Sequence, residues 1–262
     1  VLSLGTVGCN MGCEFCQNWH LSKAKNFEAM KTEASPNEIA QLAHSKKCES
    51  VAFTYNEPII FAEYAIDTAK QCHDLDIKTV AVTAGYISKK ARKEFFSVMD
   101  AVNLDLKAFS NDFYKEHCNA ELKHVLDTIL FIRHNTNAWL ELTTLLIPDI
   151  NDDPKEIKSM CKWIAKNLGT EVPLHFSAFH PSYKMMDSYS TPVETLGKAR
   201  KIALACGIKY VYIGNIYDKE ANSTWCPACK ELLIERKGFE LGACNIEGNI
   251  CAFCGKDIAG CF

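Results

Sequence analysis

The sequence Gly8-Cys9-Asn10-Met11-Gly12-Cys13-Glu14-Phe15-Cys16 follows directly on a strand-like run at residues 1–7. Its cysteines have the spacing C-x3-C-x2-C, and cysteine thiolates are the usual protein ligands of iron–sulfur clusters. Three thiolates on so short a segment can bind three irons of a [4Fe–4S] cubane and leave the fourth iron free for another ligand. We therefore predict that Cys9, Cys13 and Cys16 hold a [4Fe–4S] cluster.

Zinc is the alternative occupant of this motif. A structural zinc ion takes four Cys or His ligands. His20 follows Cys16 closely enough to supply the fourth ligand. The spacing alone therefore leaves zinc open.

The composition is that of a globular protein that carries metal sites. Of the 262 residues, 48% are hydrophobic and 23% are charged, and the net charge of -3 predicts no general attraction to nucleic acid. No apolar run approaches the roughly 20 residues that span a bilayer. Nine of the 14 cysteines cluster near the two ends of the chain, with metal-ligand spacing at both ends, so we expect a reducing, cytoplasmic location instead of a disulfide framework. Because Val1 already lies in a strand-like run, we also expect a further segment to precede it.

Strand-like and helix-like segments alternate up to about residue 213. The repeated βα pattern predicts a parallel sheet with helices outside it, in which ligands lie at the C-terminal ends of the strands. Six or seven such units favour a partial (βα)6-type barrel, and a doubly wound open sheet is the alternative. The predicted strands are residues 1–7, 50–54, 78–83, 101–105, 139–146, 173–178 and 209–213.

Three segments have the features of helix starts. Each places a capping residue before a proline and an acidic residue soon after it, and glycines at 169 and 207 are suitable stops for the last two helices. The three starts are Ser35-Pro36-Asn37-Glu38, Asp153-Pro154-Lys155-Glu156 and Thr191-Pro192-Val193-Glu194.

The C-terminal part differs from the rest of the chain. Residues 217–262 contain six cysteines and only short strand-like pieces, such as residues 232–235. Two C-x2-C pairs separated by 21 residues predict a zinc ribbon with a tetrahedral set of four thiolates. A second iron–sulfur cluster is the alternative, with Cys244 and Cys261 as substitute ligands. We predict two domains, residues 1–216 and residues 217–262, and the predicted zinc ligands are Cys226, Cys229, Cys251 and Cys254.

The cysteine motif, Phe15 before its last cysteine and the following Gln17-Asn18-Trp19 resemble the radical S-adenosylmethionine (SAM) superfamily. The branch is that of the pyruvate formate-lyase activating enzymes, and the likeness is greatest to the radical SAM member of the AmmeMemoRadiSam system. This resemblance covers essentially the whole chain, including the C-terminal ribbon. It implies that the fourth iron binds the methionine part of SAM, and it favours iron over zinc.

The resemblance also implies SAM contacts at the ends of the first strands. Glu57 matches the last residue of the superfamily's Gly-Gly-Glu segment, beside Asn56, and it would bind the SAM ammonium group. Its alternative role is to cap the following helix. Asp105 and Lys107 match an Asp-x-Lys segment, with a structural ion pair as the alternative. Phe15 belongs to the same predicted site.

Further predicted contacts lie on the later strands. Glu141 and Thr143 share one face of their strand, where buried polar packing is the alternative to SAM contact. His180 matches a SAM-contacting histidine, whereas His175 is expected to be a core histidine. The loop of residues 181–190 is expected to face the substrate, with Tyr183 and Tyr189 as weak candidates. The family's monovalent-cation site is in doubt, because Val82 and Ala84 replace its polar residues.

The function implied by the resemblance is that of a radical SAM oxidoreductase. It would cleave SAM reductively to a 5'-deoxyadenosyl radical, which abstracts hydrogen from an unknown substrate. The alternatives are an activase of a glycyl-radical enzyme and a non-catalytic metal-binding adaptor. An electron donor such as flavodoxin or ferredoxin is the implied partner, and Memo-like and AMMECR1-like proteins are further candidates.

Overall fold

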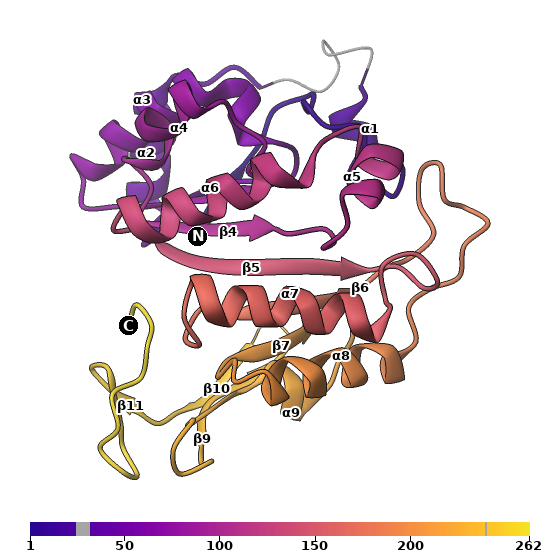
Figure 1. Cartoon of the computed structure of the whole chain (residues 1–262). Coiled ribbons are helices and arrows are strands. Elements are labelled where there is room, and N and C mark those ends of the chain that lie inside the picture. Colours follow the sequence, from indigo (N-terminus) through magenta and orange to yellow (C-terminus); the bar gives the residue numbers. More distant parts are fainter. Residues whose placement is uncertain (25–31, 239) are drawn as a thin grey trace. The chain divides into compact units, whose positions relative to one another are not determined.

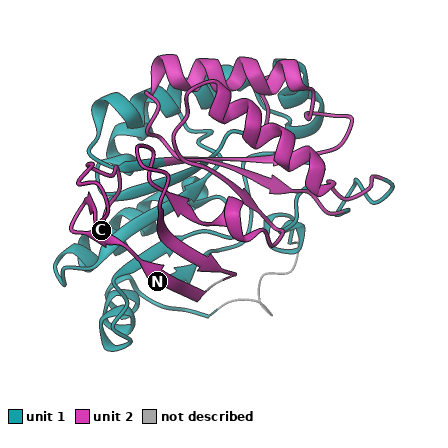
Figure 2. Cartoon of the chain, turned by 90° about the horizontal axis from the view of Figure 1, so that it is seen from below, with its two compact units in different colours: residues 1–106, 110–140, 181–187 teal, residues 107–109, 141–180, 188–262 magenta. Residues whose placement is uncertain are grey.

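The computed structural model describes residues 1–24, 32–238 and 240–262. Two compact units make up the chain (Figure 2). The first comprises Val1–Leu106, Ser110–Leu140 and Pro181–Asp187, and the second comprises Lys107–Phe109, Glu141–His180 and Ser188–Phe262. Residues 217–262 lie wholly within the second unit, and the predicted domain boundary after residue 216 stays a prediction.

Parallel strands form the centre of the fold. Within the described residues they belong to a seven-stranded sheet in the order β1-β2-β3-β4-β5-β6-β7. The strand order follows the chain order from β1 to β7, whereas the strand order of a doubly wound sheet reverses direction after the first strands. The prediction of a barrel-type fold is therefore confirmed. The strands are β1 (Leu2–Leu4), β2 (Ser50–Phe53), β3 (Lys78–Thr83), β4 (Ala101–Asp105), β5 (Trp139–Leu146), β6 (Leu174–Ala178) and β7 (Val211–Gly214).

Helices connect successive strands, as Figure 1 shows along the colour gradient. Two of the predicted starts are confirmed: Ser35 forms a capping box with Glu38, and the Asp153 carboxylate accepts a bond from the Lys155 N–H. The helical segments are α1 (Trp19–Ser22), α2 (Pro36–Ser45), η2 (Pro58–Phe61), α3 (Ala62–His73), α4 (Lys89–Phe96), α5 (Asn111–Cys118), α6 (Leu122–Asn135), α7 (Pro154–Asn167), α8 (Val193–Ala205) and α9 (Lys219–Asn222).

The predicted start of α8 is wrong by one residue. The helix begins at Val193 and Pro192 occupies the capping position, where its side chain makes no capping bond. Thr191 is buried instead, because its hydroxyl donates to the Leu146 carbonyl at 2.6 Å and accepts from the Phe179 N–H at 2.8 Å. Thr191 therefore joins the ends of β5 and β6 and does not cap the helix.

Alternation along β5 separates two faces of the sheet. The even-numbered residues from Leu140 to Leu146 are buried, whereas the odd-numbered residues, among them Glu141 and Thr143, are half-buried. In the second unit, α8 packs against β6 and β7, so the buried side chains of these strands meet apolar helix faces. The half-buried face carries Glu141 and Thr143, and the buried face is apolar except for Thr144.

The C-terminal segment forms small antiparallel sheets. Its strands are β8 (Thr224–Trp225), β9 (Leu232–Lys237), β10 (Glu240–Cys244), β11 (Ile246–Glu247) and β12 (Ile250–Cys251). A small core joins them to the start of β7, because Tyr210 packs with Cys226, Leu233, Cys251 and Ile258. The segment therefore has a core of its own that includes Tyr210, the residue directly before β7.

An acidic side chain organises the N-terminal ends of β3 and β4. The Asp100 carboxylate accepts bonds from the Thr79 N–H at 2.8 Å and from His73 at 2.9 Å, and it pairs with Lys78 at 3.3 Å. Burial acts to raise the pKa of Asp100, but these partners together outweigh burial and lower the pKa below its ordinary value. The ionised carboxylate therefore stabilises the folded state.

Acid should remove the stabilisation that Asp100 provides. A depressed folded-state pKa gives stability that is present above the unfolded pKa and is lost as the pH falls through the folded pKa. Denaturant midpoints measured from about pH 7 to about pH 3 should thus fall less steeply for Asp100→Asn than for the parent protein. Asp67→Asn, which removes an exposed pair with Lys70, is the control and should leave the slope unchanged. Equal slopes for parent and Asp100→Asn would contradict the assignment.

No helix in the part of the chain that the structure describes is long and apolar enough to cross a membrane.

Candidate functional site

The three N-terminal cysteines lie on the irregular loop between β1 and α1. Cys13 is buried, and Cys9 and Cys16 are half-buried. The Met11 N–H donates to the Cys9 sulfur at 3.4 Å, and the Cys16 sulfur lies 3.2 Å from the Ser22 hydroxyl. These two contacts hold the Cys9 and Cys16 side chains beside polar groups of nearby residues.

Backbone bonds hold this loop against the end of α5. The Gly12 N–H donates to the Cys118 carbonyl at 2.7 Å, and the Glu14 N–H donates to the His117 carbonyl at 2.9 Å. A Cβ atom at Gly12 would lie 3.0 Å from the Cβ of Asn119, so glycine permits the close approach. These contacts fix the backbone between the cysteines without using the sulfur atoms.

Phe15 and Lys23 complete the support of the loop. The Phe15 ring is buried and lies 5.6 Å from the Phe113 ring. The Lys23 ammonium donates to the Met11 carbonyl at 2.6 Å. Packing on α5 accounts for the burial of Phe15, and its contact with a cofactor stays a prediction.

Asn56 anchors the backbone that enters the cysteine loop. Its amide nitrogen donates to the Gly8 carbonyl at 2.9 Å and to the Thr6 hydroxyl at 3.2 Å, and its oxygen accepts from the Thr6 N–H at 3.1 Å. Gly8 has a left-handed φ of 102°, and a Cβ there would meet Ile60. Asn56 therefore sets the direction in which the chain approaches Cys9.

The Glu57 carboxylate is buried and bonded on both oxygens. It accepts from the Thr83 hydroxyl at 2.5 Å, from the Ala84 N–H at 2.8 Å and from the Ile59 N–H at 3.3 Å. The helix-capping role is thus present, together with a link to the end of β3. The bond to the SAM ammonium group stays a prediction.

The turn after β3 and the end of β4 lie beside this carboxylate link. Gly85 has a left-handed φ of 68°, and a Cβ at this position would overlap Leu104. Asp105 is the last residue of β4 and is half-buried. Both residues belong to the first unit, whereas Lys107 belongs to the second.

A buried asparagine holds the segment that carries Lys107. The Asn151 amide nitrogen donates to the Lys107 carbonyl at 2.7 Å and to the Leu145 carbonyl at 2.9 Å. The Asn151 oxygen accepts from the Ile147 N–H at 2.6 Å. The Glu156 carboxylate holds the same segment two residues on, through the Phe109 N–H at 2.7 Å. Burial raises the pKa of Glu156 and outweighs this bond.

Replacing Asn151 by alanine should destabilise the fold. The change removes three hydrogen bonds, to two carbonyls and one N–H, at a site where Asn151 is only 2% exposed. Each buried polar group left unpaired costs about 1–3 kcal/mol, so we expect a loss of roughly 3 kcal/mol or more in denaturant unfolding. Asn137→Ala, at an exposed position, should change stability by less than about 0.5 kcal/mol. A loss for Asn151→Ala no greater than that of the control would contradict the role assigned to this side chain.

The half-buried face of the second unit carries a row of polar groups. The Glu141 carboxylate lies 2.7 Å from His175 Nε2, and the His175 ring stacks on Tyr212 at 5.0 Å. The Tyr212 hydroxyl continues the row to Thr224 Oγ1 at 2.9 Å. Sequence reasoning missed the pairing of Glu141 with His175. The only signal was that both residues occupy the same face of neighbouring strands, and the strand register was unknown.

The remaining predicted residues of the later strands are Thr143 and His180. Thr143 is half-buried on the same face as Glu141. His180 is exposed, and its Nδ1 atom lies 3.3 Å from the Ser190 hydroxyl. The SAM contacts of Glu141, Thr143 and His180 stay predictions, as do those of Asp105 and Lys107.

Part of the loop after β6 packs against the cysteine loop within the first unit. The Ser182 hydroxyl donates to the Cys16 carbonyl at 3.1 Å, and the Lys184 N–H donates to the Glu14 carbonyl at 3.0 Å. Tyr183 stacks on Trp19 with ring centres 5.7 Å apart. Tyr189 belongs to the second unit and donates to the Asp149 carboxylate at 2.7 Å. The two tyrosines therefore have different partners.

The four ribbon cysteines meet as the sequence predicts. The sulfur atoms of Cys226, Cys229, Cys251 and Cys254 all lie within 4.8 Å of one another. Burial opposes ionisation of Cys226, but backbone N–H groups at Cys229 and Ala228 outweigh it and lower the pKa of this thiol to about 7. Four converging sulfurs, one of them readily ionised, suit a tetrahedral metal ion.

The comparison with known proteins decides the family. A family model described as "Radical SAM superfamily" matches residues 3–163, which is more than half of the chain.

The chain belongs to the radical SAM superfamily.

The chain is also similar to individual proteins of known sequence or structure. An uncharacterized protein of Methanocaldococcus jannaschii is 39% identical over 260 residues, which is 98% of this chain and 77% of the relative. The pyruvate formate-lyase-activating enzyme of Clostridium pasteurianum is 25% identical over 179 residues, covering 66% of this chain and 72% of that enzyme. A radical SAM methyltransferase from Sphaerobacter thermophilus has the same fold, with a TM-score of 0.62, 16% identity, and 88% and 69% of the two chains covered.

Membership of the radical SAM superfamily makes the chain an enzyme of the radical SAM oxidoreductase type. It implies a [4Fe–4S] cluster and SAM as cofactors. The donor set of the N-terminal loop fits this cluster, since it offers three sulfur ligands on one supported loop with an N–H directed at Cys9. The specificity of the AmmeMemoRadiSam system stays a prediction.

Proposed function

We propose that the chain cleaves SAM reductively at a [4Fe–4S] cluster held by Cys9, Cys13 and Cys16, and that the product radical abstracts hydrogen from a substrate. The observation that carries the proposal is the support of the cysteine loop. Bonds to α5, to Asn56 and to residues 181–187 fix its backbone, while the three sulfur atoms lie on a segment without regular structure. Such support holds ligands in place before a cofactor binds.

Cys9, Cys13 and Cys16 would hold the cluster, which would supply the electron for the reductive cleavage of SAM. The chain itself holds and orients the participants. Asn56 directs the backbone into Cys9, and Glu57 ties the start of η2 to the end of β3. We propose that Glu57 and Asn56 thereby position the SAM contacts of the first unit, among them Asp105. The proposed SAM contacts Lys107, Glu141, Thr143 and His180 belong to the second unit.

Activation of a glycyl-radical enzyme is the second candidate function. The relatives that carry an activity name support it, since several are named as activating enzymes of pyruvate formate-lyase or of 4-hydroxyphenylacetate decarboxylase. In this role the substrate would be a glycine residue of a partner protein. Memo-like and AMMECR1-like proteins stay the predicted partners for the first function, and a flavodoxin or ferredoxin is the proposed electron donor for both.

The four C-terminal cysteines are proposed to bind zinc. Four sulfurs at the corners of one small site match its preferred geometry, and the adjoining core of Tyr210, Leu233 and Ile258 gives the metal a packed surrounding. The metal is proposed to stabilise the ribbon and to take no part in SAM cleavage.

An anaerobic turnover assay tests the proposed function. The protein is reconstituted with iron and sulfide, reduced with dithionite and given SAM, and 5'-deoxyadenosine is quantified. Production of 5'-deoxyadenosine in proportion to cluster content is the expected result. A fully loaded cluster that yields no product above the protein-free control would favour the adaptor alternative and overturn the proposal.

The two substrate classes separate in a second step of the same assay. A purified glycyl-radical enzyme is added, and the glycyl radical is sought by electron paramagnetic resonance. A radical signal that requires both SAM and this chain would favour the activase. Unchanged 5'-deoxyadenosine production without a radical signal would favour a different substrate.

A further inference from the structure

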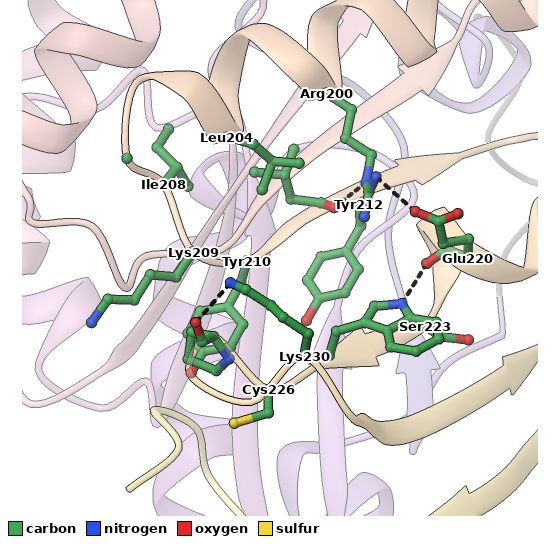
Figure 3. A pocket seen from close by; sticks show the side chains of 14 residues that line it. Arg200, Leu204, Ile208, Lys209, Tyr210, Tyr212, Glu220, Ser223, Cys226 and Lys230 are labelled. Carbon is green, nitrogen blue, oxygen red and sulfur yellow. Dashed lines mark hydrogen bonds and ion pairs between the residues drawn. The ribbon is translucent and has the colours of Figure 1, made fainter. Parts of the chain in front are cut away.

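A cavity of about 620 Å³ lies in the second unit (Figure 3). It is bounded by the last turns of α8, the start of β7 and the entry to the ribbon. A volume of this size lies within the range of small-molecule sites. The side chains that matter for its chemistry are Arg200, Leu204, Tyr212, Glu220, Trp225 and Lys230.

Two aromatic side chains give the cavity a rigid apolar surface. The Tyr212 hydroxyl bonds with the Thr224 hydroxyl at 2.9 Å, and the Trp225 Nε1–H donates to the Glu220 carbonyl at 2.9 Å. Leu204 adds an aliphatic wall, and it is 40% exposed although it is a large apolar residue. Because both rings are already held, a ligand that packs on them need not order them first.

The cations that line the cavity differ in their partners. Arg200, Lys209 and Lys230 line it together with the Glu220 carboxylate, and the Lys209 ammonium is paired with the Glu171 carboxylate at 2.8 Å. The Arg200 Nε–H donates to the Val211 carbonyl at 3.1 Å, and Nη1 pairs with Glu220 at 3.5 Å. A guanidinium carries five N–H donors, so these two contacts use only part of them. The Lys230 ammonium bonds only a backbone carbonyl here, that of Pro227 at 2.7 Å, among the described residues.

The edge of β7 argues against a peptide strand as the occupant. The Val211 carbonyl is bonded by Arg200, and the Ile213 carbonyl is bonded by the Asn222 amide at 2.5 Å. An added strand would need these same acceptors for its ladder. A compact ligand that lies on the side chains meets no such competition.

We propose that this cavity binds a small molecule with a flat aromatic body and one anionic group. Tyr212, Trp225 and Leu204 contact the body, and Lys230 and Arg200 bind the anion. No residue that lines the cavity is a predicted SAM contact, and binding there does not require turnover.

Two matched probes test the proposal by isothermal titration calorimetry on the full chain with both metal sites loaded. The probe 1-anilinonaphthalene-8-sulfonate has an aromatic body and a sulfonate, and N-phenyl-1-naphthylamine has the same body without a charge. We expect saturable binding of one sulfonate per chain, at least about tenfold tighter than binding of the neutral amine, because charge-assisted bonds are lost with the sulfonate. Equal affinities, or no saturation, would overturn the proposal.

Variants then place the probe in the cavity. Lys230→Asn removes the cation at a residue whose φ of 67° asparagine tolerates, and it should weaken sulfonate binding about tenfold without changing amine binding. Leu204→Glu should abolish binding of the sulfonate. The control for Lys230→Asn is Lys201→Asn, which removes a cation on α8 outside the cavity. The control for Leu204→Glu is Leu42→Glu, because Leu42 is 41% exposed and belongs to the first unit. Unchanged binding in Leu204→Glu, or equal losses in the controls, would show that the probe binds elsewhere.

Discussion

Cys13→Ala should lower the iron content of the reconstituted protein from about four atoms per chain to near zero. A cubane needs its thiolate ligands, and two remaining cysteines hold it poorly. Cys13 is the most buried of the three, so a replacement ligand from solvent reaches this corner least easily. The visible absorbance of the cluster and the production of 5'-deoxyadenosine should be lost together.

Cys48→Ala is the matched control for this variant. Cys48 is half-buried in the same unit and lies outside the cysteine loop, so its replacement should leave both iron content and turnover unchanged. Zinc content at the ribbon should be the same in both variants. Full iron content and SAM cleavage in Cys13→Ala would refute the assignment of the three cysteines.

Cys226→Ala should remove the metal of the ribbon and destabilise the C-terminal segment. Zinc content is expected to fall from about one atom per chain to near zero, because a structural site takes four ligands. Structural zinc contributes about 10–16 kcal/mol of apparent binding free energy in zinc-finger peptides, so the segment should unfold well below the melting temperature of the parent protein. Cys229→Ala should behave in the same way, and the N-terminal cluster should remain in both variants.

The exposed cysteines of the same segment provide the controls. Cys244 and Cys261 are the substitute ligands of the iron–sulfur alternative, and neither belongs to the group of four converging sulfurs. Cys244→Ala and Cys261→Ala should keep the parent zinc content and melting temperature. Loss of metal in either control, or unchanged zinc in Cys226→Ala, would mean that the ligand set is different. Iron bound at this site in place of zinc would support the alternative cluster.

The effect of Cys226→Ala should extend to the cavity beside the ribbon. Cys226 and Lys230 belong to the same knuckle, and both line the cavity. Loss of the metal should therefore weaken binding of the aromatic sulfonate as well, whereas Cys13→Ala should not affect it. The two metal sites are thus expected to have separate consequences.

Local spacing alone determined much of this protein. The ligand pairs of the ribbon, the strands β3, β4 and β5 and the caps at Ser35 and Asp153 all depend on residues a few positions apart, where covalent geometry and helix or strand periodicity limit the outcome. The cysteine motif belongs to the same class. Its spacing, together with Phe15 and Trp19, indicated the family that the comparison with known proteins shows.

Only the tertiary structure decided which distant groups meet. The bond of Asn151 to Lys107, the pairing of Glu141 with His175 and the role of Thr191 between β5 and β6 depend on strand register and loop paths. A register shift of one residue would move such side chains to the opposite face of the sheet, and no local pattern specifies the register between strands that are separated by a helix. The partners of buried polar groups are therefore known only once the strands are aligned, because burial then requires each donor and acceptor to find a bond.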